Sequence, residues 1–600
     1  MLKKDLFFEQ LLVFIFFCTV YIYHLYPALT PRDGIEIACY APRLIALHQP
    51  GYPLFLLLSK AFAIVFPLGN QAYQLSLFSA VCSALALTVL YGTVRIYLSH
   101  NASIELQGIS IFCSFFGIFV VGLSPVFFSQ AILAEVFSLN TLIAAIILDR
   151  LVRISQPVFC QSKDVVVLFL LMGLGLAHHQ TIVFLFPAIA FAVISARKEL
   201  LLNRKLLIRA VAYFIIGFSV YFSLIPLSGN SFLKATSWIR LLSDFQRSNF
   251  GSLSLARPGV FQITQDARVL SYIGWLSEIV IQLFSNLGMI GFICMIVGAC
   301  YLKIFKNLTG RIIMLIAIFK GPVFLFFILG MDRTPENIAT TSRFMHMPCI
   351  VLPIMIGCGT WAIVQQFANK HRVAALIAMA CVAISTCPHL IGSVLSQNRR
   401  NCFVPEDYAT NLWYSIRTNS TLLLTQNTEV IAYQYYKMKT TTRETIPVEA
   451  VVFDAPVSAG SRNHWIRVVN GLAARSDLLA SASLTLSMGI PPGMQISPRG
   501  LLVDIKSSSG NGIRENTRLT TNLFILRGVE SEVFRSDVFV NGLIGQYYAG
   551  ELFVAQADMI SKKYVEAKRD CHAAVDYAYN QFSKDLARRC LETLEKLDVR

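Results

Sequence analysis

Long apolar blocks, each close to the length of a membrane span, dominate the chain before residue 393. A bilayer core requires about 20 consecutive apolar residues per helix, more than an ordinary buried helix supplies. The pattern therefore predicts an α-helical polytopic membrane protein with about eleven spanning helices. The expected spans lie near residues 7–27, 74–95, 107–127, 130–149, 165–178, 180–196, 205–227, 272–302, 311–330, 344–366 and 373–392.

Two apolar stretches are shorter than ordinary spans. Residues 53–66 form a run of about 14 residues between Pro53 and Pro67, which is typical of an interfacial or re-entrant helix. Both arms of the 165–196 hairpin are also short, so we expect its turn to lie inside the bilayer.

The pattern changes after residue 393, where polar, alternating segments replace the apolar blocks. Residues 421–425 and 451–453 indicate strands, and residues 548–597 have helical periodicity with mixed charge. We therefore divide the chain into a transmembrane domain at residues 1–392 and a C-terminal soluble domain at residues 393–600. The second domain is expected to be of the α/β or α+β class and helical near its end.

Composition supports the membrane interpretation. Only 14% of the residues are charged and 55% are hydrophobic, whereas about 25% are charged in a typical soluble protein. The net charge of +16 comes mainly from cations in short loops between apolar blocks, which follows the positive-inside rule and does not indicate nucleic-acid binding. Lys3 and Lys4 place the N-terminus in the cytoplasm, and an odd number of spans then places the C-terminal domain on the extracytoplasmic side.

One predicted outer loop, residues 228–271, departs from the positive-inside rule. Three interpretations stay open: the topology is wrong there, the cations serve an anionic ligand, or they are ordinary solvated loop charges. The loop carries the cations Lys234, Arg240, Arg247, Arg257 and Arg268 and the acids Asp244 and Asp266.

Two cysteines of the C-terminal domain, Cys571 and Cys590, can pair if that domain lies in an oxidising compartment. The chain has no Cys-x-x-Cys spacing, which argues against a zinc site.

Two polar motifs follow the first expected span on the outer side. Asp33 and Glu36 are three residues apart, so on a helix they share a face. A carboxylate there can act as a general base, and the equally weighted alternative is that Asp33 caps the helix that starts at Gly34. In His48-Gln-Pro-Gly-Tyr-Pro53 the prolines and the glycine fix an irregular backbone, and His48 either binds a ligand or completes a turn.

Three further polar groups are expected at the same face of the membrane. Glu135 is predicted about one turn inside a helix, where a lone carboxylate needs a partner or a water-filled cavity. His178 and His179 lie at the hairpin turn and point in different directions, which disfavours a shared metal. They either form hydrogen bonds to a sugar or phosphate or, as the equally weighted alternative, belong to an ordinary polar turn. Arg343 suits bidentate binding of a phosphate, and interfacial snorkelling is its alternative.

The ordered set of motifs resembles a family of polytopic proteins that was long catalogued only as a domain of unknown function. Its vertebrate member is a transmembrane O-mannosyltransferase that acts on immunoglobulin-like domains of plexins. The resemblance covers residues 28–200 well and the remainder loosely. It rests on residues 33–36, 48–54, 129–140, 173–181, 343–348 and 406–435.

The resemblance implies a GT-C type glycosyltransferase that moves a sugar from a polyprenyl-phosphate donor to an extracytoplasmic protein or glycan. By position it implies that Asp33 is the catalytic base, with Glu36 as runner-up. The substrate-binding residues would be His48, Glu135, His178, His179 and Arg343. The sequence departs from the family at Gln49, where a proline is expected, and at Gly34-Ile35, where Ser-Gly is typical. No metal ligands are assigned, and a need for a divalent metal stays open.

A transporter or flippase of lipid-linked sugars is the alternative. It predicts an inverted internal repeat with interrupted helices in both halves, and the Pro/Gly-rich segment 48–53 has no clear counterpart after residue 205. A membrane-anchored sensor would not need eleven helices or intramembrane acids. For the location, the sequence favours a bacterial inner membrane over a eukaryotic internal membrane.

Overall fold

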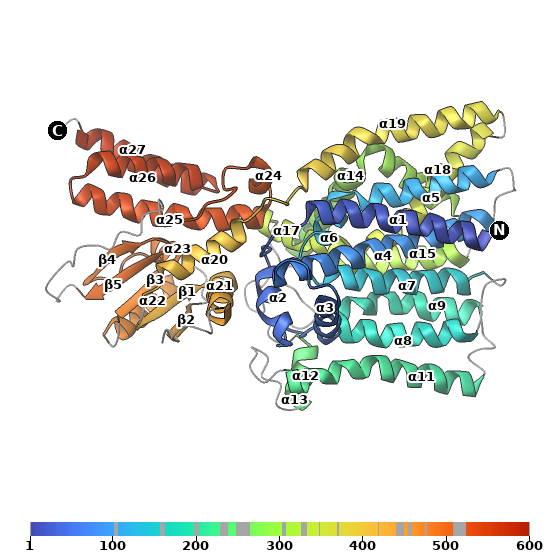
Figure 1. Ribbon diagram of the computed structural model, residues 1–600, viewed down its shortest axis with the longest axis horizontal. Helices are drawn as coiled ribbons and strands as arrows, with labels where there is room; N and C mark the ends of the chain where they lie inside the picture. The colour runs from blue at the N-terminus through green and yellow to red at the C-terminus, as the bar shows by residue number, and fades with distance from the viewer. Residues whose placement is uncertain are drawn as a thin grey trace. The chain divides into compact units, whose positions relative to one another are not determined.

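The computed structural model forms two compact units (Figure 1). Unit 1 comprises Met1–Leu25 and Tyr40–Arg400, and unit 2 comprises Tyr26–Cys39 and Asn401–Arg600. The structure describes residues 2–100, 106–156, 162–196, 203–227, 238–247, 265–302, 308–325, 333–346, 348–368, 371–417, 419–439, 449–453, 459–474, 477–507 and 524–598.

Unit 1 is a bundle of long apolar helices that run alongside one another (Figure 1). A helix overlaps each of the expected spans, so the multi-pass helical class is confirmed. The helices are α1 (Leu2–His24), α4 (Gln71–His100), α5 (Gln107–Gly122), α6 (Pro125–Ala131), α7 (Phe137–Ile154), α8 (Ser162–His178), α9 (Phe186–Ala196), α11 (Arg204–Ser219), α14 (Gln265–Tyr301), α15 (Leu308–Lys320), α18 (Leu352–Ala368) and α19 (Arg372–Ser396).

Helix length gives a smaller number of membrane crossings than the eleven that the hydropathy pattern predicts. Within the described ranges, 5 helices are long and apolar enough to cross a membrane, or up to 7 if each bent pair counts as one span. One such pair, α5 and α6, bends by 71°. The remaining bundle helices, α7, α8, α9 and α15, have 18, 17, 11 and 13 residues and do not meet this test, so eleven crossings stay a prediction.

Glycines allow the closest helix crossings of unit 1. A Cβ atom at Gly298 of α14 would overlap the carbonyl oxygen of Met355 on α18, and one at Gly359 would overlap that of Cys294. Small residues at such crossings let backbones approach closely, which is how helices associate in lipid. Helix α14 is also broken at Gly288, whose φ of 65° and ψ of 171° are not helical.

Short elements connect the bundle helices at one end of unit 1. The predicted short apolar helix is confirmed as α3 (Pro53–Val65), whose Ile64 and Val65 are 69% and 67% exposed. The other short elements are η1 (Ala41–Arg43), η3 (Gln180–Leu185), η4 (Val220–Ser223), α12 (Leu224–Leu227), α13 (Trp238–Phe245), α16 (Pro322–Leu325), α17 (Pro335–Ser342), η6 (Arg343–His346) and η7 (Pro348–Ile350).

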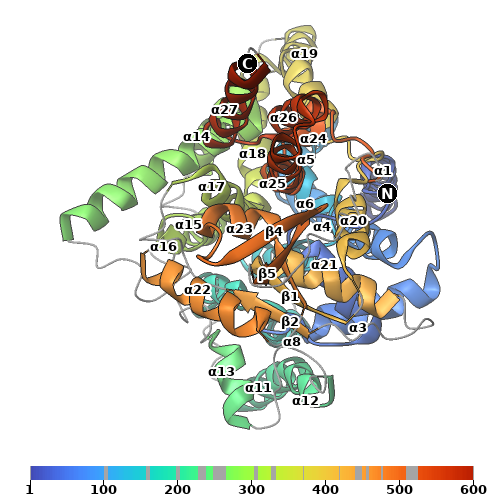
Figure 2. The ribbon, with the colours of Figure 1, turned by 90° about the vertical axis from the view of Figure 1, so that its left-hand side faces the viewer.

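A mixed five-stranded sheet forms the centre of unit 2, in the order β2-β1-β3-β5-β4 (Figure 2). Strand β1 is parallel to β2 and β3, whereas β5 is antiparallel to β3 and β4. The two strands expected from the sequence are confirmed as β1 and β2. The strands are β1 (Ser420–Thr425), β2 (Glu449–Phe453), β3 (Asp477–Ser481), β4 (Met494–Arg499) and β5 (Leu502–Ser507).

Helices complete unit 2, and the expected helical region near the end of the chain is present. Helices α26 and α27 are joined by a disulfide between Cys571 and Cys590, the pair that the sequence suggested. The helices are α20 (Val404–Ser415), α21 (Gln426–Lys439), α22 (Ala459–Ala473), α23 (Ala482–Met488), α24 (Glu532–Arg535), α25 (Val538–Ile560), α26 (Tyr564–Tyr577) and α27 (Gln581–Asp598).

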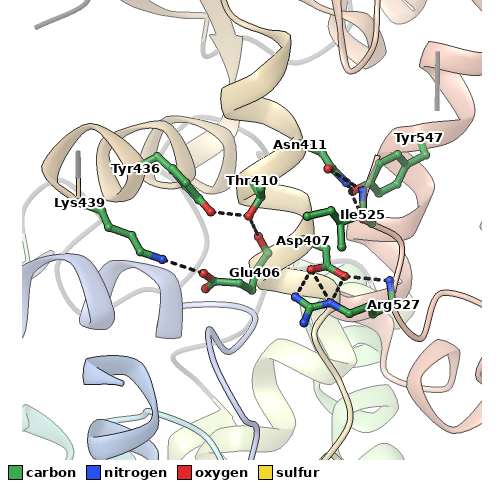
Figure 3. A network of polar contacts seen from close by, with 9 residues as sticks. All are labelled: Glu406, Asp407, Thr410, Asn411, Tyr436, Lys439, Ile525, Arg527 and Tyr547. Atoms are coloured by element: carbon green, nitrogen blue, oxygen red, sulfur yellow. Dashed lines mark hydrogen bonds and ion pairs between the residues drawn. The ribbon is translucent and has the colours of Figure 1, made fainter. Parts of the chain in front are cut away.

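Helix α20 holds several segments of unit 2 together through polar contacts (Figure 3). The Asp407 carboxylate accepts hydrogen bonds from the backbone and the guanidinium of Arg527, which raises the pKa of that guanidinium. The Asn411 amide donates to the Ile525 carbonyl at 2.7 Å and to the Tyr547 hydroxyl at 2.7 Å. One helix thus fixes the segment that follows residue 524 and helix α25.

The segment 26–39 packs within unit 2, although it follows the first helix of the chain. The Arg32 guanidinium lies 4.2 Å from the ring centroid of Phe539 on α25, and Cys39 Sγ lies 3.6 Å from Met438 Sδ on α21. The two compact units are therefore not separated by a single boundary at residues 392 and 393, because residues 26–39 belong to the same unit as residues 401–600. Sequence position alone gave no sign of this packing.

Candidate active site

Asp33 and Glu36, the two predicted catalytic residues, lie in unit 2 at the start of helix α2 (Gly34–Tyr40). The backbone carbonyl of Asp33 accepts the first helical hydrogen bond from Ile37 N at 2.8 Å, so Asp33 occupies the N-cap position. Glu36 is only 4% exposed, and a carboxylate oxygen of each residue lies within 4.8 Å of the other. The expected shared face is therefore formed, and the capping position that the alternative interpretation predicted is also occupied by Asp33.

The other five predicted site residues lie in unit 1, where His48 begins the irregular segment before α3. Its Nε2 lies 3.4 Å from the Tyr52 hydroxyl. The Tyr52 ring in turn lies 5.6 Å from the ring of His179 and 6.2 Å from that of His178, between centroids. Tyr52, which the sequence analysis did not select, therefore connects the His48 motif to the histidine pair.

Two anchors hold the segment 48–53 in place. The Gln49 amide donates to Asp244 Oδ1 at 2.7 Å, and the Tyr221 hydroxyl donates to the Pro50 carbonyl at 3.0 Å. Gln49 is the residue at which the chain departs from the family pattern. Its amide binds a buried acid of the unusual loop 228–271, which gives the departure a local structural role.

The histidine pair ends helix α8, and each ring has a defined hydrogen bond. His178 Nε2 donates to the Val136 carbonyl at 3.0 Å. His179 Nδ1 accepts from the backbone N–H of Thr181 at 3.3 Å. Because Nδ1 accepts, the proton of a neutral His179 lies on Nε2, where it can be donated to a substrate oxygen.

Glu135 and Arg343, which are far apart in the sequence, form an ion pair within unit 1. Arg343 Nη1 lies 3.8 Å from Glu135 Oε1, and the Glu135 side chain is fully buried while that of Arg343 is 17% exposed. The rings of Phe137 and Phe344 flank the guanidinium, each centroid 5.7 Å from its central carbon. Phe137 also lies 5.3 Å from His179, so the pair and the histidines share one site.

The expected position of Glu135 inside a helix is wrong. Helix α6 ends at Ala131 and α7 begins at Phe137, so Glu135 lies in the break between them. The Ser138 hydroxyl donates to the Gln130 carbonyl at 2.8 Å, which satisfies a backbone group exposed by the break. The apolar run is continuous through this region, so hydropathy gives no sign of the interruption.

Cations surround His179 beyond those that the sequence analysis selected. Arg247, Lys320 and Arg343 all lie close enough to act on His179 electrostatically. Arg247 was recognised as one of the loop cations, but Lys320 was missed. A lysine inside the apolar block 311–330 is costly in a membrane, and this cost was the signal that could have identified it.

His346 is a second missed residue, three positions after Arg343. It is fully buried, and its Nδ1 lies 2.6 Å from the Thr141 hydroxyl on α7. Among the other cations of loop 228–271, Lys234 and Arg257 lie outside the described residues. Arg240 and Arg268 lie in α13 and α14, and their side chains are outside the described part of the structure.

Chemically, the site in unit 1 combines several cations with imidazole hydrogen-bonding groups. Glu135 is the acid paired with Arg343, and Lys320 and Arg247 add further positive charge. Such a site suits a phosphate, which arginine can bind in bidentate fashion, next to groups that can bond sugar hydroxyls.

The N-terminal part of this chain matches a known domain family. Residues 33–202 match the N-terminal domain family of the protein O-mannosyl-transferase TMEM260. Residues 33–202 are therefore similar to this domain family. The TMEM260-type domain contains Asp33, Glu36, His48, Glu135 and the histidine pair, whereas Lys320 and Arg343 lie outside it. The family resemblance inferred from the motifs is confirmed.

Two curated relatives carry the same name. The chain is 31% identical over 240 residues to the protein O-mannosyl-transferase TMEM260 of Mus musculus, covering 38% of this chain and 32% of the mouse protein. The chain is 26% identical over 415 residues to the protein O-mannosyl-transferase tmem260 of Dictyostelium discoideum, covering 64% of this chain and 48% of that protein. The chain thus spans half or less of each relative. Both relatives are eukaryotic, and the bacterial location stays a prediction.

Solved structures extend the likeness to both units. The apo structure of ArnT from Cupriavidus metallidurans superposes with a TM-score of 0.53 at 10% identity, covering 84% of this chain and 99% of ArnT. ArnT bound to undecaprenyl phosphate gives a TM-score of 0.50 at 11% identity, covering 85% and 99%. The likeness shows that the chain has the expected GT-C fold.

Proposed function

We propose that the protein is a GT-C glycosyltransferase that moves a sugar, mannose by analogy with the relatives' names, from a polyprenyl-phosphate donor to an acceptor hydroxyl. The observation that carries the proposal is the buried site of unit 1, where the Glu135–Arg343 pair lies beside His179 among further cations. A site with this charge balance suits a phosphate-linked sugar. The ArnT structure that binds undecaprenyl phosphate supports the choice of donor.

In the proposed reaction the Asp33 carboxylate takes the proton from the acceptor hydroxyl. The acceptor oxygen then bonds to the anomeric carbon of the sugar, and the bond from that carbon to the phosphate oxygen breaks. The polyprenyl phosphate leaves with the bonding electron pair. Glu36, whose carboxylate lies within 4.8 Å of that of Asp33, is the alternative base.

The leaving phosphate gains negative charge as the glycosidic bond breaks, so groups that stabilise it contribute to the rate. Arg343 is the first candidate for this role, and His48, His178, His179 and Glu135 would bind the sugar. The Nε2 proton of a neutral His179 suits a hydrogen bond to a sugar hydroxyl.

We further propose that the N-terminus is cytoplasmic and that unit 2 lies on the extracytoplasmic side, where it would recognise a protein or glycan acceptor. The disulfide between Cys571 and Cys590 supports this side, since disulfides persist in oxidising compartments. No nucleic acid is a proposed partner. Membrane lipid and the lipid-linked sugar are the proposed small-molecule partners.

The test is sugar transfer by the purified full-length protein in detergent, with radiolabelled polyprenyl-phosphate mannose and a mixture of candidate acceptor proteins and glycans. We expect Asp33→Asn to reduce transfer by about a thousandfold, since it removes the base. The matched control is Asp576→Asn, which changes an exposed aspartate on α26.

The outcomes separate the candidate functions. Transfer that is retained in Asp33→Asn but lost in Glu36→Gln would assign the base to Glu36. The protein would be a flippase and not an enzyme if no donor supported transfer and the lipid-linked sugar moved between the leaflets of proteoliposomes.

A further inference from the structure

Helix α15 ends in a lysine that is almost completely buried. Lys320 is 2% exposed, and its Nζ has no hydrogen-bond partner among the residues that the structure describes. An ammonium group removed from water is costly unless an opposite charge or several acceptors replace its hydration. Its burial therefore requires a partner that the described residues do not supply.

Packing fixes the position of Lys320 next to the candidate site. Helix α15 packs against α9 and η3, the element that begins directly after His179. After Gly321, the short helix α16 places the Phe324 ring 5.3 Å from that of Phe344 and 5.9 Å from that of Phe184. Phe344 directly follows Arg343, so the end of α15 and the Arg343 segment are packed together.

Three cations act on His179. Lys320, Arg343 and Arg247 all lie close enough to His179 to act on it electrostatically, and Arg343 forms an ion pair with Glu135. For Lys320, the described residues supply no such pair. An anion bound between Lys320 and Arg343 would offset the burial cost of the ammonium.

We propose that Lys320 is an anion-binding residue that holds, with Arg343, the phosphate of the lipid-linked donor. The inference rests on the proposed function and adds a residue outside the TMEM260-type domain to its site. The two cations have complementary roles: Arg343 presents a planar fork of donors, whereas Lys320 presents a compact charge that can follow the phosphate oxygens.

The competing explanation is a purely structural lysine, bound to a carbonyl or acid within the protein. The two explanations predict opposite effects on the ligand-free protein. If Lys320 binds an anion and has no partner in the ligand-free protein, Lys320→Met removes an uncompensated buried charge and raises the melting temperature. If Lys320 has a structural partner, the same change lowers it.

The experiment measures the thermal unfolding of the purified full-length protein in detergent, alone and with increasing polyprenyl phosphate or inorganic pyrophosphate. A ligand that binds only the folded state stabilises it by RT ln(1 + L/Kd), where L is the ligand concentration, so the melting temperature rises with the ratio of ligand concentration to Kd. The variants are Lys320→Met and Lys320→Gln, with Lys320→Arg to keep the charge. The matched control is Lys205→Met, which removes an exposed lysine on α11.

We expect wild type and Lys205→Met to be stabilised by polyprenyl phosphate, with at least a tenfold weaker apparent affinity in Lys320→Met and Lys320→Gln and partial retention in Lys320→Arg. Equal affinity in wild type and Lys320→Met would overturn the inference and leave the proposed function intact. If both neutral variants failed to fold, Lys320 would have a structural partner, and the inference would again be wrong.

Two further outcomes separate the inference from the proposed function. Stabilisation of wild type by pyrophosphate alone, lost in Lys320→Met, would support the anion site while removing the lipid-phosphate donor from the proposal. Absence of stabilisation by either anion in wild type would overturn the anion site itself.

Discussion

The two ends of the unit 1 bundle differ in how closely their buried charged side chains are paired. At one end, Arg95 Nε lies 3.1 Å from Glu9 Oε2, and Arg153 Nε lies 2.8 Å from Asp149 Oδ2. At the other end, the closest ion-pair contact between Arg343 and Glu135 is 3.8 Å, and Lys320 has no hydrogen-bond partner within the described part of the chain. The buried charges at the first end are closely paired within the protein, whereas at the second end the described residues supply no hydrogen-bond partner for Lys320.

Helix α7 makes the comparison direct because it extends from one end to the other. Glu135 lies just before its first residue, Phe137, and Asp149 and Arg153 lie in its last turns. The ion-pair contact of the acid before this helix is 3.8 Å, and that of the acid in its last turns is 2.8 Å. Removing one partner of a close buried ion pair destabilises a fold, whereas a buried charge without a close partner can mark a site.

The largest effect is expected at the second end. Arg343→Gln should reduce the rate of sugar transfer by on the order of a thousandfold, because it removes positive charge from the leaving phosphate. Glu135 would also lose its ion-pair partner. The measurement is kcat/KM for the lipid-linked donor, with Arg343→Lys as the charge-preserving control. Near-normal transfer by Arg343→Gln would show that this end is structural like the other.

A smaller effect, on stability and not on rate, is expected at the first end. Arg95 is a hub: besides Glu9 it contacts Gln107 Oε1 at 3.2 Å and Ser110 Oγ at 3.2 Å. Arg95→Met should lower the free energy of unfolding by about 3 kcal/mol, since the Glu9 carboxylate would be left without its closest cation. Denaturant unfolding in detergent measures the loss.

The control for Arg95→Met is the transfer rate per folded molecule, which we expect to stay near that of the wild type. A large fall in that rate would break the comparison, because it would mean that the first end also takes part in the reaction. Arg95→Lys, which keeps the charge but not the fork of donors, should fall between the two in stability.

The sequence predicted the helices of unit 1 better than their ends. Apolar runs define where a helix lies in lipid, and every expected span contains a helix. The break before Phe137 was missed because residues 130–149 are apolar throughout except for a few polar positions, and a bend of the backbone does not change hydropathy. Contacts between distant segments, such as Arg32 with Phe539, have no local signal at all.

The candidate site was partly predictable for the same reason. Glu135, Arg343 and the histidine pair were selected because polar groups at membrane depth are costly, and the structure brings them together with His48 through Tyr52 and Phe137. The same rule applies to Lys320 but was not applied to it. Tyr52 could not have been selected, because a tyrosine near a membrane surface is common and its role depends on which rings surround it.

The smallest effect is expected for Arg153, which belongs to the first end but has a substitute. Arg153 is 29% exposed, and Asp149 keeps two other partners, Arg150 at 3.4 Å and the Thr93 hydroxyl at 3.2 Å. Arg153→Gln should therefore cost only about 0.5–1 kcal/mol in unfolding free energy, with no change in transfer rate. A double-mutant cycle with Asp149→Asn isolates the pair. A coupling energy as large as the effect of Arg95→Met would mean that Arg150 does not compensate, and that each ion pair at this end is needed individually.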